Sequence, residues 1–321
     1  MKKRSDHFDG RRYYNPGVPP RSLWKVLHWM LNRKVKPWPF VLIEQQKVAQ
    51  ERTKQGECVV TFINHSTVLL QLEGWNILTD PIWSDRASPF TWMGPKRVTL
   101  PGIKFEDLPP IDIVLLSHNH YDHMDISTLR RLSREHQSIF FVPKGNQSYL
   151  KSKGITLYVN ELDWWDRVDF ALEYGLYFVP AQHFSARGIF DRNTTLWGGF
   201  VIKGSKQMIY FAGDTGFSSH FAEIQKKLGS PTLSLLPIGA FEPRGFMRTV
   251  HLSPEEAVKA HLILGSKQSM AIHFGTFQLA DESINAPIKE LKSSLQNQGL
   301  PAESFWILEP GEARKVNEDI L

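Results

Sequence analysis

Four potential metal ligands crowd into the stretch Ser117-His118-Asn119-His120-Tyr121-Asp122-His123. It follows the apolar run 111–116, which has the length and composition of a buried strand. Imidazoles and a carboxylate packed together at a strand end lose hydration and compete for protons, a conflict that a bound cation removes. Because Cys58 is the single cysteine, a cage of thiolates is excluded and His, Asp or Glu must supply the ligands. The stretch therefore predicts a metal site.

The spacing inside this stretch favours two metal ions rather than one. Side chains two residues apart in an extended loop point to the same side, so His118 and His120 can share one ion. Asp122 and His123 lie one turn further on and can reach a second ion nearby.

Further along the chain, short apolar runs predict strands that end at acidic residues or histidines. The run 76–79 ends at Asp80, the run 207–213 at Asp214, and the run 270–272 at His273. In each half, a later apolar run (111–117 and 232–237) returns to the same edge. Two similar αβ halves packed sheet to sheet would bring these strand ends together. Residues 59–63 and 68–72 predict two more strands, and residues 84–110 a long loop.

Two stretches carry signals for a helix start. Asp125 can cap a helix with Ile126, Leu129 and Leu132 on one face. The stretch 253–256, Ser-Pro-Glu-Glu, is a capping box with proline at the first helical position, and its helix extends to about Gly265.

Charge divides the chain into a basic N-terminal arm, residues 1–54, and a larger domain, residues 55–321. The arm carries thirteen Lys/Arg against four Asp/Glu, whereas the rest carries 25 against 29. A helix predicted over residues 22–33 either packs on the domain or lies in a membrane interface, and the aromatic residues of 13–40 favour a lipid partner over nucleic acid. Neither an apolar run of spanning length nor a secretory signal is present, so we expect a cytoplasmic protein, peripheral at the membrane.

The stretch 117–123 resembles the H-x-H-x-D-H signature of the metallo-β-lactamase superfamily, and the order of the later motifs agrees with it. The resemblance implies the αββα four-layer sandwich of that α/β fold. It also implies a ligand set for two metal ions. Metal one takes His118, His120 and His183, metal two takes Asp122, His123 and His273, and Asp214 bridges them.

A narrower resemblance covers most of the chain from about residue 20. The stretches 78–81, 94–97 and 251–277 are similar to the family of phospholipases D that hydrolyse N-acyl-phosphatidylethanolamine. This implies a phosphodiesterase with two Zn²⁺ ions and a phospholipid substrate, releasing N-acylethanolamine and phosphatidic acid. Iron or manganese as the metal, and a lactonase, another ester hydrolase or a nuclease on the same fold, stay open as alternatives. A non-enzymatic scaffold is disfavoured by the complete ligand set, and the sequence leaves the oligomeric state open.

Three residues are candidates for catalysis: Asp122 within the ligand set, Asp80 and His251. Asp80 is expected to hydrogen-bond a ligand histidine and fix its tautomer. His251 either donates a proton to the leaving oxygen, binds phosphate, or is an ordinary loop residue. His65 is interpreted as a supporting or structural residue, and Lys96 and Arg97 as solvated turn residues.

Overall fold

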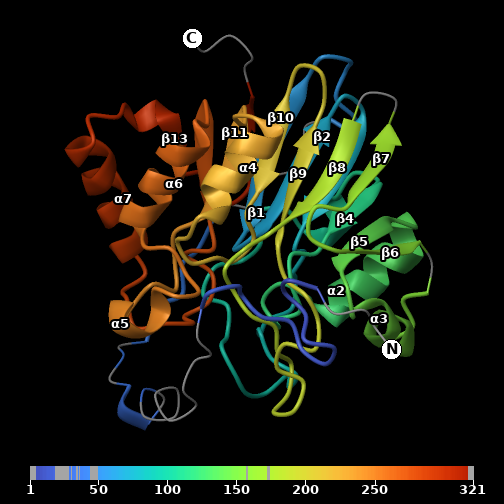
Figure 1. Cartoon of the computed structure of the whole chain (residues 1–321), viewed down its shortest axis with the longest axis horizontal. Coiled ribbons are helices and arrows are strands. Elements are labelled where there is room, and N and C mark those ends of the chain that lie inside the picture. The colour runs from blue at the N-terminus through green and yellow to red at the C-terminus, as the bar shows by residue number, and fades with distance from the viewer. Residues whose placement is uncertain are drawn as a thin grey trace.

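The computed structural model describes residues 5–18, 29, 31–33, 35, 37–43, 50–156, 158–171 and 174–316. Two seven-stranded mixed sheets form its framework, and the N-terminal half of the chain builds most of the first (Figure 1). The spatial order of that sheet is β14-β1-β2-β3-β4-β5-β6. Its strands are β1 (Cys58–Asn64), β2 (Thr67–Leu72), β3 (Trp75–Thr79), β4 (Ile113–Leu115), β5 (Ile139–Pro143), β6 (Val159–Leu162) and β14 (Ala313–Lys315).

The second sheet has the order β13-β12-β11-β10-β9-β8-β7. Its strands are β7 (Arg167–Ala171), β8 (Tyr174–Val179), β9 (Gly199–Lys203), β10 (Met208–Phe211), β11 (Leu233–Pro237), β12 (Gln268–Ile272) and β13 (Phe305–Trp306). In both sheets the central strands are parallel: β3 pairs with β4, and β10 with β11 and β12. Parallel neighbours end at the same edge, so the loops that follow them meet there.

Helices cover the outer faces and complete the predicted αββα sandwich. Against the first sheet lie α2 (Ile126–Arg131), the π-helical turn η2 (Leu132–His136) and α3 (Gln147–Ser152). Against the second lie α4 (His220–Leu228), α6 (Pro254–Leu264) and α7 (Ala286–Asn297). The short helix α5 (Arg244–Met247) and the 3-10 turns η1 (Phe105–Asp107) and η3 (Ala302–Ser304) lie in connections. No helix among the described residues is long and apolar enough to cross a membrane.

Alternation of side chains along the strands explains why the first sheet is apolar on both faces. Ile77 and Ile113 point into the core between the sheets, whereas their neighbours Leu78 and Val114 pack against α2 and α3. The inner core contains phenylalanines from both sheets, including Phe62 and Phe178. A continuous apolar run is the sequence pattern of such a doubly covered strand.

The helix starts inferred from the sequence agree with the structure. Asp125 accepts a hydrogen bond from the backbone N–H of Ser127 at the start of α2. Ser253 and Glu256 form both halves of the capping box of α6, and Gly265 ends that helix in the left-handed conformation. Most of the helix predicted over 22–33 lies outside the described residues.

The described part of the N-terminal arm packs on the domain. Phe8 and Tyr13 are buried in the inner core, and Asn15 Nδ2 donates to the backbone oxygen of His183 at 2.8 Å. Burial disfavours the charged form of His7, but hydrogen bonds with Asp163 at 2.8 Å and Asp6 at 2.6 Å outweigh burial and raise its pKa above the ordinary value. Residues 5–18 therefore support the backbone of a predicted metal ligand.

Candidate metal centre

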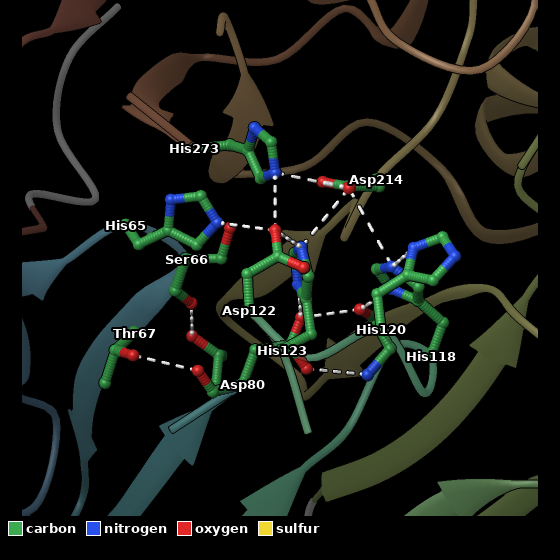
Figure 2. A network of polar contacts seen from close by, with 12 residues as sticks. His65, Ser66, Thr67, Asp80, His118, His120, Asp122, His123, Asp214 and His273 are labelled. Atoms are coloured by element: carbon green, nitrogen blue, oxygen red, sulfur yellow. Dashed lines mark hydrogen bonds and ion pairs between the residues drawn. The ribbon is translucent and has the colours of Figure 1, made fainter. Parts of the chain in front are cut away.

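Loops at the carboxyl ends of five strands bring the predicted ligands to one place between the two sheets (Figure 2). The stretch 118–123 follows β4, and Asp80 follows β3. From the other half, His183 follows β8, Asp214 follows β10 and His273 follows β12. Contacts join the halves directly: Gly198 N donates to Ser117 O at 3.0 Å, and a Cβ at Gly213 would lie 2.5 Å from that of Ser117. The site is thus shared by both halves.

The first group contains His118, His120, His183 and Asp214, with ligand atoms within 4.8 Å of one another. Nδ1 of His118 donates to Ser117 Oγ, because that hydroxyl itself donates to Asp80. Nδ1 of His183 donates to the Val250 carbonyl at 2.8 Å. Both rings therefore present an Nε2 lone pair, 2.8 Å and 3.2 Å from Nδ1 of His120. A single proton on His120 cannot serve both acceptors, whereas a cation satisfies all three nitrogens.

The second group contains His65, Asp122, His123 and His273. Nδ1 of His123 donates a hydrogen bond to Asp80. This bond orients the ring so that its Nε2 points toward Asp122 and Asp214, each 3.2 Å away. Nε2 of His273 lies 3.2 Å from Asp214 and 3.4 Å from Asp122. Among the described residues, neither Nε2 atom has a hydrogen-bond partner of acceptable geometry. Nitrogens aimed at carboxylate oxygens in this way form a pocket that fits a metal ion.

Electrostatics within the centre also call for a cation. Burial lowers the pKa of His120 to about 4, and burial next to His273 lowers the pKa of His65 to about 3, so both rings are neutral near pH 7. Burial disfavours protonated His273 too, but the charge of Asp214 and the close polar contacts with Asp122 and Asp214 together outweigh burial and raise its pKa to about 9. The carboxylates thus require positive charge beside them, which a divalent ion supplies.

Asp80 is linked by hydrogen bonds to a histidine of each group, directly to His123 and through Ser117 to His118. Its carboxylate accepts from Ser117 N at 2.7 Å, from Ser117 Oγ at 2.5 Å and from His123 Nδ1 at 2.6 Å. Burial raises the pKa of Asp80, while these three donors favour its ionised form. Because Ser117 in turn accepts from His118, one buried carboxylate sets the tautomers of a histidine in each group.

Three residues of the centre have a backbone conformation that glycine normally adopts. The φ angles are 47° at His65, 31° at Asp80 and 61° at His273. A non-glycine residue in this region costs about 1–2 kcal/mol, and such strain concentrates at functional sites. The geometry of the ligands is therefore maintained at the expense of local backbone energy.

His251 lies at the rim of the centre, outside the two groups of candidate ligands described above. Its Nδ1 is 3.9 Å from Asp214, and its ring is 5.2 Å from that of His183. Unlike His123 and His273, it is partly exposed, so a bound substrate can reach it. Of the ligands in the stretch 118–123, only His120 is similarly accessible.

The structure agrees with one minor interpretation and corrects another. His65 is a supporting residue, because its Nε2 hydrogen-bonds Asp122 at 3.0 Å. Arg97 is not a solvated turn residue: it is buried and donates to the carbonyls of Ile82, Ser84 and Thr99. Lys96 is exposed, as expected.

Sequence reasoning missed Arg187, which supports the ligand stretch from outside. Its Nη1 donates to the carbonyls of Asn119 and Met124, both at 2.9 Å, and its guanidinium lies 4.0 Å from the ring centroid of Tyr121. Tyr121 Oη in turn donates to Arg187 O at 2.7 Å. An isolated arginine in a glycine-containing loop carries no sequence signal of this role.

Comparisons with known proteins agree with this architecture. Residues 75–274 match the Beta-lactamase superfamily domain. The chain is 39% identical over 269 residues to N-acyl-phosphatidylethanolamine-hydrolyzing phospholipase D 1 of Caenorhabditis elegans, covering 80% of this chain and 76% of that protein. It is 34% identical to the mitochondrial N-acyl-phosphatidylethanolamine-hydrolyzing phospholipase D of Saccharomyces cerevisiae, covering 76% of this chain and 53% of the yeast protein.

Solved structures show the same fold at low sequence identity. A possible metal-dependent hydrolase from Veillonella parvula superposes with a TM-score of 0.66 at 16% identity, over 81% of this chain and 99% of that one. The metallo hydrolase Igni18 from Ignicoccus hospitalis gives a TM-score of 0.58 at 22% identity, over the same shares of the two chains.

Proposed function

Because the chain belongs to the metallo-β-lactamase superfamily, in the branch of N-acyl-phosphatidylethanolamine-hydrolysing phospholipases D, we propose that it is a metal-dependent phosphodiesterase of that substrate class. The products would be N-acylethanolamine and phosphatidic acid. The observation that carries the proposal is the convergence of ligands from both halves of the chain on two adjacent groups.

We assign two zinc ions to these groups, since an all-His/Asp set of borderline donors suits zinc. His118, His120 and His183 would hold one ion, Asp122, His123 and His273 the other, and Asp214 would bridge them. Divalent ions in such a site supply Lewis-acid chemistry and acidify water, so that a nucleophile exists near neutral pH.

The chain's own residues position the reactants. Asp80 holds the rings of His123 and, through Ser117, His118 in the orientation that ligation needs. His251, partly exposed beside Asp214, would give a proton to the departing oxygen as the P–O bond breaks. The burial of the remaining ligands excludes bulk water and strengthens each charge interaction. The positive charge of residues 1–54 would attract the chain to an anionic lipid surface.

A substrate panel tests the assignment. Purified protein, its metals quantified by elemental analysis, is given N-acyl-phosphatidylethanolamine, a lactone, a thioester and single-stranded RNA. We expect N-acylethanolamine and phosphatidic acid from the first substrate, and loss of this activity after chelation with recovery on adding zinc. Turnover of the lactone or the RNA without the phospholipid would reject the substrate class.

His251→Gln provides a sharper test of the proposed proton donor. Loss of a general acid costs roughly 100-fold or more in kcat for a substrate with a poor leaving group. A phosphodiester that releases para-nitrophenolate needs no such proton, so its turnover should fall much less. Equal losses on both substrates would remove His251 from this role.

A further inference from the structure

Large apolar side chains are exposed on two loops close to the metal centre. In the loop after β8, Ile189 is 90% exposed and Phe190 is 87% exposed. In the long loop after β3, Trp92 is 71% exposed, and its neighbours Phe90 and Met93 are also exposed. We call residues 90–93 and 189–190 the apolar rim.

The two parts of the apolar rim belong to one face of the molecule. Both loops project from the same end of the sandwich (Figure 1). A single cavity of about 670 Å³ is lined by Phe90 and Thr91 from one loop and by Arg187 from the other. Clustered apolar groups beside a cavity mark an interaction surface more often than scattered ones do.

Hydrogen bonds fix the backbone of both loops next to the exposed apolar side chains. Asp191 accepts from the backbone N–H groups of Arg187 and Gly188. Arg12 donates to the Phe190 carbonyl, and in the other loop Arg86 donates to Gly94 O at 2.6 Å. These contacts leave the side chains of the apolar rim facing outward.

The partly exposed ligand of the metal centre adjoins the same loop. His120, the accessible ligand, has its ring 4.5 Å from that of Phe184, and Arg192 lies 4.3 Å from the Phe184 ring centroid. A surface contacting Ile189 and Phe190 would therefore lie next to the entrance. Arg187 also connects this loop to the ligand stretch through Asn119 and Met124.

Charge near the apolar rim favours a lipid surface as the partner. Arg12 donates to the Phe190 carbonyl, Arg192 follows Phe190 by two residues in the chain, and the exposed Lys96 follows the Trp92 loop. Aromatic and aliphatic side chains bordered by cations suit the zone where lipid headgroups meet acyl chains, especially in anionic bilayers.

We propose that the apolar rim, residues 90–93 and 189–190, docks the protein on an anionic lipid bilayer and sets the metal-centre entrance against the headgroups. The inference rests on the proposed function for the substrate but adds a binding surface outside residues 1–54.

The test compares two variants matched in chemistry. The rim variant carries Trp92→Gln, Ile189→Gln and Phe190→Gln. The control carries Leu262→Gln and Ile263→Gln, which are 46% and 41% exposed near the end of α6, far from the carboxyl ends of the strands. Sedimentation with vesicles of equimolar phosphatidylcholine and phosphatidylglycerol measures docking. Hydrolysis of vesicular N-acyl-phosphatidylethanolamine and of soluble bis(para-nitrophenyl) phosphate measures activity.

The rim variant should bind vesicles at least about tenfold more weakly. Each apolar side chain that inserts into the bilayer raises the partition coefficient by roughly tenfold or more. Its hydrolysis of vesicular lipid should fall in parallel, while its turnover of the soluble phosphodiester stays within about twofold of wild type. The control should behave like wild type in all three assays.

Vesicle binding of the rim variant equal to wild type would overturn the docking proposal, as would an equal loss in the control. Rim-dependent binding to single-stranded RNA but not to vesicles would overturn the choice of lipid. If vesicle binding depends on the apolar rim but no phospholipid is hydrolysed, docking stands and the proposed substrate fails. The sedimentation and activity arms thus separate the two ideas.

Discussion

Replacing Asp80 by asparagine isolates the carboxylate that orients a histidine in each group of ligands. In the native structure both oxygens accept hydrogen bonds, and every neighbour is a donor: Ser117 N, Ser117 Oγ and His123 Nδ1. An asparagine amide offers one acceptor oxygen and one NH₂ donor. Its NH₂ group would face Ser117 Oγ and His123 Nδ1, so either the contact is lost or the His123 proton moves to Nε2, the nitrogen that faces Asp122 and Asp214.

The expected loss of metal affinity follows from this tautomer conflict. Removing the hydrogen-bond partner of a metal-bound histidine costs about 10–100-fold in metal affinity, or about 1.4–2.8 kcal/mol. Loss of a buried charged acceptor also lowers the free energy of unfolding by roughly 1.5–3 kcal/mol. Asp80→Asn should therefore weaken both folding and metal binding, with the larger functional effect on the ion next to His123.

Asp125→Asn is the matched control, because Asp125 is also a buried carboxylate surrounded by donors. It accepts from Ser84 N, Ser84 Oγ, Ser127 N and Thr128 Oγ1, and none of these bears a predicted metal ligand. Chelator competition measures metal affinity, and thermal unfolding measures stability. Both variants should unfold at lower temperature, but only Asp80→Asn should bind metal more weakly. Equal metal affinities in the two variants would refute the tautomer argument.

Three further predictions concern pH, capping and close packing. His7→Gln should destabilise the protein by about 1–3 kcal/mol at low pH and by less at high pH. The raised pKa of His7 gives stability that is complete below its unfolded pKa of about 6.5 and is lost as pH rises through the folded pKa, so thermal unfolding near pH 5.5 and pH 8.5 checks the sign. Ser253→Ala should cost about 1 kcal/mol by removing the α6 cap while leaving metal affinity unchanged; a larger loss of metal than of stability would contradict this. Gly213→Ala should reduce metal content, since its Cβ would meet the Ser117 side chain at 2.5 Å, whereas Gly229→Ala, at positive φ with open space around it, should cost only about 1 kcal/mol of stability. Similar metal content in both glycine variants would argue against close packing of the halves at the site.

The parts of the fold that follow from local sequence were predictable. The runs ending at Asp80 and Asp214 are strands β3 and β10, and each pairs in parallel with a later apolar strand, as the repeated pattern of the two halves suggests. The capping box at Ser253 also fixes a helix start by short-range hydrogen bonds. Pairing between distant segments is different, because no local pattern shows that β14 from the C-terminal end pairs with β1.

The residues of the candidate site also fall into those that local sequence reveals and those that only tertiary contacts reveal. The crowding of His118 to His123 and the strand ends before Asp214 and His273 are visible in the sequence. The contact of Asn15 with the backbone of His183 is not, because it joins the N-terminal arm to a loop far along the chain. The part played by Arg187 is equally hidden, since its partners are backbone carbonyls, which every residue possesses. Such tertiary contacts are properties of the packed fold rather than of a motif.

The proposed function depends on a pair of cations bound between the two halves of the chain. Anomalous diffraction from crystals grown with zinc, recorded on both sides of the zinc absorption edge, locates such ions without reference to activity. We expect one peak among His118, His120 and His183. We expect another among Asp122, His123 and His273, with Asp214 between the two. Crystals of the zinc-loaded protein with no anomalous peak in this centre would contradict the proposed function.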